Sequence, residues 1–121
     1  MAQVASKIID QGPAAAIDRG QLARMTFGDR SLEREVLQLF DRQAAILIER
    51  MRSGDAAAIG SLAHTLKGSA AGIGAQRVAR AADVAEFTAG ASAAECSRAL
   101  DRLAQAVDEA RTLIAELLSA S

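Results

Sequence analysis

The only histidine of the chain lies in a stretch of small and apolar residues, A-H-T-L-K-G-S-A-A-G-I-G-A, that runs from Ala63 to Ala75. Successive residues of an α-helix are about 100° apart, so His64, Lys67 and Gly68 fall on one face. The opposite face gathers the apolar side chains, which are Ile59, Leu62, Leu66, Ala70 and Ile73. The pattern predicts an amphipathic helix whose apolar stripe faces the interior and whose histidine faces outward.

An exposed imidazole beside a lysine and a glycine suits nucleophilic chemistry on a phosphoryl group. Histidine titrates near pH 6.5, so a large fraction of the ring is neutral and nucleophilic at neutral pH. A phosphoryl group on the ring would carry about two negative charges, which the ammonium of Lys67, one turn away, would stabilise. Gly68 leaves room beside the ring, and Gly60 and Ser61 add little bulk on the same side. Such a flat surface suits docking into another protein's active site better than enclosing a small substrate.

A lone histidine can also be a core residue, an idle surface residue, a metal ligand or part of a catalytic group. A core histidine is disfavoured because His64 points away from the apolar stripe, whereas a surface histidine without a task stays open on position alone. One histidine and one cysteine cannot complete a four-ligand zinc site within the chain. No Asp or Glu lies at helical spacing from His64 to orient it as in a Ser/His/Asp group. Cys96 is most simply a small buried apolar residue.

Length and composition indicate one soluble domain. The chain has 121 residues, enough for a core without disulfides or metals, and half of them are apolar. Its net charge of -1, with both signs interspersed, and its lack of Trp and Tyr argue against nucleic-acid binding. It has no secretion signal and no run of about 20 apolar residues that would span a membrane. The single cysteine fits a reducing compartment, so we expect a cytoplasmic protein.

Hydrophobic periodicity of 3.6 residues predicts helices throughout, and no segment alternates with a period of two. Residues 1–16 have no clear period and are expected to form a tail, followed by a domain over residues 17–121. A short helix follows a cap at Asp18 and stops at Gly28, and longer helices are expected over about 30–52, 56–73, 76–88 and 93–118. Asp29, Asp55 and the Ser92–Glu95 capping box precede three of these. The inward stripes are Val36, Phe40, Ala44, Leu47 and Met51; Val78, Ala81, Ala82 and Ala85; and Cys96, Leu100, Leu103, Val107, Ala110, Ile114 and Leu117. The predicted fold is all-α: an antiparallel up-down four-helix bundle with a short additional N-terminal helix.

The residues from His64 to Ala75 closely resemble the signature of histidine-containing phosphotransfer (Hpt) domains, H-x-L-K-G-[SA]-x-x-x-G-[AL]. The segment from Leu22 to Asp29 and the pair Leu39–Phe40 also look like this family, so the resemblance spans about residues 17–118. It implies a phosphorelay carrier that is not itself an enzyme. His64 would take a phosphoryl group from the aspartyl phosphate of one response-regulator receiver domain and pass it to the aspartate of another.

Carried over position by position, the resemblance makes His64 the phosphorylated residue, Lys67 the stabiliser of the phosphoryl group and Gly68 the source of clearance. It implies no cofactor of the chain's own and a magnesium ion on the receiver domain, which can belong to a hybrid histidine kinase. We expect a monomer. Arg77 and Arg80 of the next helix are candidates for assisting the histidine, although a solvated face explains them as well.

Two alternatives remain. The chain can be the phosphorylatable domain of a chemotaxis-type histidine kinase, for which ATP is the donor through a separate catalytic domain. It can also be a helical adaptor that has kept the bundle without phosphotransfer.

Overall fold

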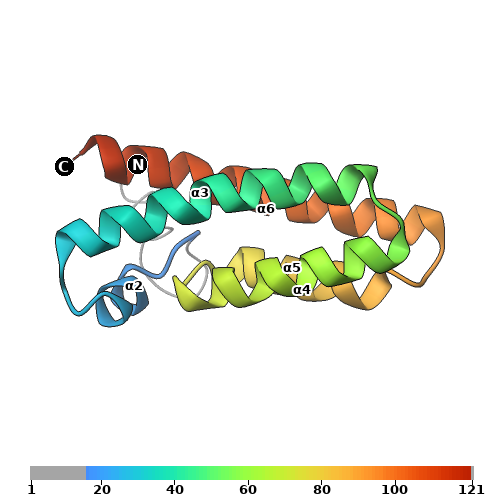
Figure 1. Cartoon of the computed structure of the whole chain (residues 1–121), viewed down its shortest axis with the longest axis horizontal. Helices are drawn as coiled ribbons and strands as arrows, with labels where there is room; N and C mark the ends of the chain where they lie inside the picture. The colour runs from blue at the N-terminus through green and yellow to red at the C-terminus, as the bar shows by residue number, and fades with distance from the viewer. Residues whose placement is uncertain (1–15, 121) are drawn as a thin grey trace, which may run out of the picture.

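A computed structural model of the protein describes residues 16–120, and Figure 1 shows the helices of this part of the chain. They are α2 (Arg19–Met25), α3 (Arg30–Ser53), α4 (Ala56–Gly72), α5 (Gln76–Thr88) and α6 (Ala93–Ser119). No strand occurs between residues 16 and 120, which confirms the all-α prediction. The tail predicted over residues 1–16 lies outside the described residues except for Ala16, which is itself buried.

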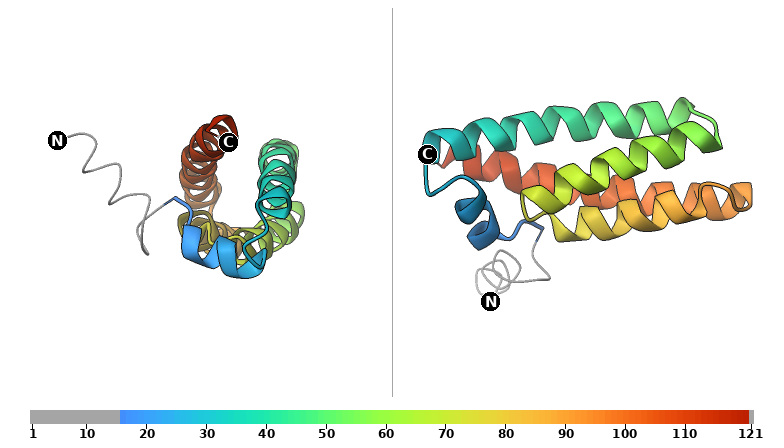
Figure 2. Two further views of the ribbon diagram at one scale, coloured as in Figure 1. Left: turned by 90° about the vertical axis from the view of Figure 1, so that its left-hand side faces the viewer. Right: turned by 60° about the horizontal axis from the view of Figure 1, so that its bottom comes forward.

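The four long helices form an antiparallel bundle, as predicted. Each packs against the next along the chain, and α6 returns beside α3 to close the ring, which Figure 2 shows nearly end-on. Links of two, three and four residues join α3 to α4, α4 to α5 and α5 to α6, and such short links force neighbouring helices to run antiparallel. The short helix α2 lies across one end of the bundle (Figure 2).

Helix starts follow the capping residues of the sequence. The side chains of Asp18, Asp29, Asp55 and Ser92 each accept a hydrogen bond from a backbone N–H in the first turn of α2, α3, α4 and α6. These bonds satisfy donors that would otherwise have no partner within the helix. The predicted starts of these four helices are therefore correct, and the reason is local chemistry.

The core is aliphatic, and its outline differs from the predicted stripes at a few positions. Val36, Leu62, Ala81, Cys96 and Leu117 are only half-buried. Positions outside the predicted stripes are buried as well: Leu37, Ala63, Ala79, Ala99 and Ala106. Each helix packs against two neighbours, so its buried arc is wider than a single stripe and extends onto one flank.

One glycine fixes the turn between α4 and α5. The helix expected over about residues 56–73 ends at Gly72, and Gly74, two residues later, adopts the left-handed conformation, with φ of +81°. A side chain at Gly74 would also lie 2.7 Å from the backbone oxygen of Asp18. The N–H of Asp18 donates to the Gly74 carbonyl at 2.8 Å, so α2 is attached to this turn. The side-chain amide of Gln21 adds a second attachment by donating to the carbonyl of Ala71.

Candidate functional site

His64 projects from the outer face of α4. Its side chain is 67% exposed, whereas Ala63 and Leu66 on the inner face of the same helix are buried. Gly68, one turn further, is exposed, and a Cβ built there would meet no atom within 4 Å. The glycine therefore fills no packing need within the described chain, and the space beside the ring is open to a partner.

A carboxylate from the neighbouring helix binds the histidine ring. Nδ1 of His64 lies 2.9 Å from Oε2 of Glu86, which comes from α5. The sequence has no Asp or Glu at helical spacing from His64 within α4, and the carboxylate comes instead from the facing helix α5, which that reasoning did not consider. His64 of α4 and Glu86 of α5 thus form a hydrogen-bonded pair between two helices, and this pair orients the ring.

The same two helices bring Lys67 to two carboxylates. Its Nζ donates to Oδ1 of Asp83 at 3.0 Å and to Oε1 of Glu86 at 3.1 Å. Glu86 therefore bridges the lysine and the histidine, with one carboxylate oxygen on each. The four side chains form a cluster, which we call the α4–α5 clamp: His64, Lys67, Asp83 and Glu86.

Hydrogen bonding in the clamp favours the charged forms of Lys67 and Glu86. The bond to Asp83, followed by that to Glu86, raises the pKa of the Lys67 ammonium above its usual value. The bond from Lys67 lowers the pKa of the Glu86 carboxyl, and the bond to His64 adds to this shift. Glu86 is therefore an anion and Lys67 a cation at neutral pH.

The position of Glu86 assigns the tautomer of the ring. A carboxylate can only accept, so Nδ1 of the neutral imidazole carries the proton that the bond to Glu86 requires. The lone pair is then on Nε2, for which residues 16–120 supply no hydrogen-bond partner. The arrangement provides an exposed nucleophile at Nε2, on a ring that Glu86 orients through Nδ1.

The two arginines considered as helpers do not join the clamp. Arg77 pairs with Glu109 of α6 through an Nη1–Oε1 contact of 3.1 Å, on the side of α5 away from α4. Arg80 lies on the exposed face of α5, and the contacts that define the clamp do not include it.

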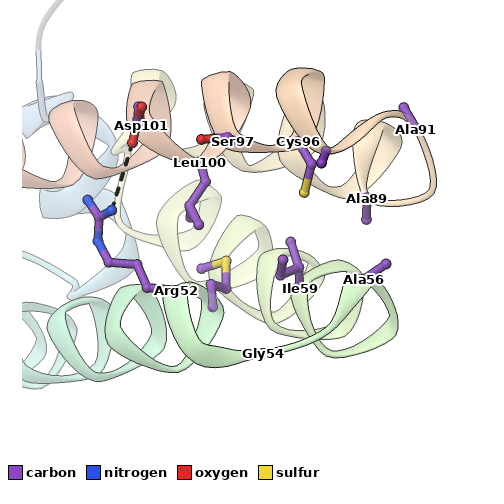
Figure 3. Close-up of a pocket in the computed structure, with 12 residues that line it drawn as sticks. Arg52, Gly54, Ala56, Ile59, Ala89, Ala91, Cys96, Ser97, Leu100 and Asp101 are labelled. Carbon is purple, nitrogen blue, oxygen red and sulfur yellow. Dashed lines mark ion pairs between the residues drawn. The ribbon is translucent and has the colours of Figure 1, made fainter.

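One groove on the surface of the bundle lies away from the histidine. It has a volume of about 490 Å³ and sits where the α3–α4 and α5–α6 links meet, at the end opposite α2. Figure 3 shows Ile59 and Leu100 lining it, with the sulfur of Cys96 directed into it and an Arg52–Asp101 ion pair at its rim. Cys96 is thus half-buried at a groove and not, as expected, wholly inside the core. Neither His64 nor the rest of the clamp contributes to this groove.

We looked for metal-binding clusters and membrane-spanning helices among the described residues. Between residues 16 and 120, no three His, Cys, Asp or Glu side chains come together in a way that could hold a metal ion. None of the helices in this range is both long and apolar enough to cross a membrane.

Comparison with known proteins places the chain in a family. The family model named Hpt domain matches residues 34–118, which is well over half of the 121 residues. No curated protein and no solved structure gives a match. The matched range includes all of α4 and α5, and with them the whole α4–α5 clamp. The chain belongs to the Hpt domain family.

Proposed function

We propose that His64 accepts a phosphoryl group from the aspartyl phosphate of one receiver domain and passes it to the aspartate of another. Membership of the Hpt family supports a role in histidine phosphotransfer, and Hpt domains interact with receiver domains. The observation that carries the residue assignment is the exposed His64 ring bound through Nδ1 to Glu86, which leaves Nε2 facing outward with its lone pair.

The transfer step follows from this geometry. The Nε2 lone pair attacks the phosphorus of the aspartyl phosphate, so that an N–P bond forms while the P–O bond to the aspartate breaks. The receiver's carboxylate leaves with the electron pair, and Nδ1 keeps its proton. The ring of His64 gains a positive charge in this step, and the carboxylate of Glu86, 2.9 Å from Nδ1, stabilises that charge. The reverse sequence delivers the group to a second receiver.

Lys67 has two roles in this proposal. Before transfer, its ammonium holds Glu86 in place against the ring through the contact of 3.1 Å. After transfer, the phosphoryl group adds about two negative charges within reach of the same ammonium. Lys67 would then exchange one of its two carboxylate contacts for a phosphoryl oxygen, and Asp83, the more exposed partner, is the one it would release.

The rest of the chemistry belongs to the partner. Gly68 and the small residues near it leave room for the receiver to approach Nε2, and a magnesium ion would act in the receiver domain, so the carrier needs no cofactor of its own. We assign the chain as a carrier and not an enzyme, and we expect a cytoplasmic monomer that meets its receivers, including those of hybrid kinases, transiently.

Phosphoryl transfer from radiolabelled receiver domains tests the proposal, with His64→Gln as the matched control. Label that is labile in acid and stable in alkali, on the wild type alone, is the expected result. Labelling by a histidine-kinase domain with ATP and by no receiver would instead show a chemotaxis-type phosphorylatable domain. Partner binding without label, and unchanged in His64→Gln, would show an adaptor.

A further inference from the structure

The end of α5 next to the histidine carries an exposed aromatic side chain. Phe87 is 89% exposed, and Val84, one turn earlier on the same helix, is also exposed. Aromatic side chains at the centre of a protein interface commonly supply much of its binding energy. Phe87 directly follows Glu86, whose carboxylate contacts the His64 ring.

The contacts of α5 show which way Phe87 faces. Asp83 and Glu86 reach across to Lys67 on α4, so they mark the flank of α5 that borders α4. Residue 87 lies about 100° further round the helix from Glu86 and about 40° from Asp83, away from the buried face of Ala82 and Ala85. Phe87 therefore stands on the outer side of the α4–α5 border, on the same side as His64.

We propose that Phe87 is the apolar anchor that a receiver domain buries when its aspartyl phosphate reaches His64. This inference rests on the proposed function and adds the residue that determines the affinity for the receiver. A transient interface of about 1,200 Å² in total covers a disc of roughly 14 Å radius on each partner. Phe87 lies inside such a disc centred on His64, because its neighbour Glu86 touches the ring.

The charges around Phe87 indicate which kind of receiver surface would complement it. Asp83 precedes Phe87 by one turn, and its side chain is 67% exposed although it accepts a hydrogen bond from Lys67. Its open side presents negative charge next to the apolar anchor. The complementary receiver surface is an apolar patch with a basic side chain beside it, and this combination favours receivers that carry it over receivers with an acidic residue there.

The chain offers a matched control for the anchor. Phe27, in the link between α2 and α3, is 90% exposed. The short α3–α4 link places His64 level with about Ala44 of α3, so the start of α3 lies roughly 21 Å along the bundle from the histidine. Phe27 precedes that start and falls outside the disc, although it is as exposed as Phe87.

A second control tests the other side of α4. Leu39 and Ile46 of α3 are exposed on the flank that borders α4, because the opposite flank of α3 pairs with α6 through Asp41 and Arg111. A receiver that docked chiefly across α3 would depend on Leu39 in place of Phe87.

The experiment compares Phe87→Ala, Phe87→Leu, Phe27→Ala and Leu39→Ala with the wild type. The protein partner is the receiver domain, among those of the source genome, that labels the wild type fastest. The second donor is phosphoramidate, which is too small to touch α5. We expect Phe87→Ala to raise the KM for the phosphorylated receiver at least tenfold with kcat unchanged. Labelling by phosphoramidate should stay within twofold of the wild type in every variant.

The conservative variant separates the anchor from a structural role. Phe87→Leu should restore most of the affinity, and Phe27→Ala should leave the KM within twofold of the wild type. The inference is overturned if Phe87→Ala keeps the wild-type KM, if it slows phosphoramidate labelling equally, or if Leu39→Ala alone raises the KM. Failure of the proposed function looks different, because the wild type itself would then take no label from any receiver.

Discussion

Removal of the Glu86 carboxylate is the sharpest test of the α4–α5 clamp. In Glu86→Ala, Nδ1 of His64 loses its acceptor at 2.9 Å, and the neutral ring divides between its two tautomers. The fraction with a lone pair on Nε2 falls, and the positive charge that develops during transfer loses its counter-charge. The His64 side chain is largely exposed and that of Glu86 is half-buried, and ion pairs near the surface change an equilibrium or a rate by less than about tenfold. We therefore expect phosphorylation of His64 to slow by about two- to tenfold.

The assay uses a small donor and a spectroscopic reading of the ring. Phosphoramidate measures the reactivity of His64 without a docking step, so receiver affinity does not enter the rate. The chain contains one histidine, so its ¹⁵N imidazole resonances report on His64 alone. With the ring neutral, the wild-type spectrum should show protonated Nδ1 and unprotonated Nε2, and Glu86→Ala should show exchange between both tautomers.

Asp83→Asn is the matched control for this prediction. It removes one carboxylate from Lys67 but leaves the contact between His64 and Glu86 in place. Its labelling rate and its imidazole spectrum should stay close to those of the wild type. Wild-type labelling by Glu86→Ala, or an unchanged tautomer in that variant, would refute the assignment of Glu86 as the residue that positions the ring.

Two glycines and the titration of the clamp give three further tests. Gly68→Ala should stabilise the fold by about 0.5–1 kcal/mol in urea unfolding, because the site is helical and open, yet it should slow transfer from receivers and not from phosphoramidate. Gly74→Ala should cost about 2 kcal/mol or more in the same measurement, because φ is +81° and the new Cβ would meet the Asp18 carbonyl at 2.7 Å. The pKa of Glu86 is lowered from its usual value of 4.5. The stabilisation from its contacts is therefore fully present above pH 4.5 and is lost as the pH falls through the lowered pKa of this carboxyl. Lys67→Ala should move the carboxyl titration of Glu86, followed by ¹³C NMR, back up toward 4.5.

The fold was predictable because its signals are local. Asp29 and Asp55 each directly precede a helix, and their side chains cap it by accepting a hydrogen bond from a backbone N–H of its first turn. The link between α3 and α4 has only two residues, so the two helices must run antiparallel. The exact buried arc was less predictable. Leu37 is buried where Val36 was expected because the neighbours of a helix, and not its own period, decide which flank of the stripe is covered.

The exposed position of His64 beside Lys67 and Gly68 could be predicted from α4 alone, but its partners could not. Glu86 belongs to a different helix, and its contact with the ring depends on the register between α4 and α5. The register is simple once the turn is known: residues 64 and 86 are equally far from residue 75, and so are residues 67 and 83. Gly74 marks the turn by its left-handed conformation, and a reversal of the chain at Ala75 places residue 64 opposite residue 86 and residue 67 opposite residue 83.

The separation between clamp and core decides how the function can be studied and how it can change. All four clamp residues are exposed or half-buried at the surface. The core beneath them consists of buried apolar side chains, such as Leu66 and Ala82, that take no part in the proposed transfer. Surface substitutions away from caps and strained turns change stability little, so variants of His64, Glu86 or Phe87 should report on transfer and docking and not on folding. By the same reasoning, the anchor on α5 can be altered for a different receiver without disturbing the bundle, whereas a change at Gly74 moves the register on which the pairing of His64 with Glu86 depends.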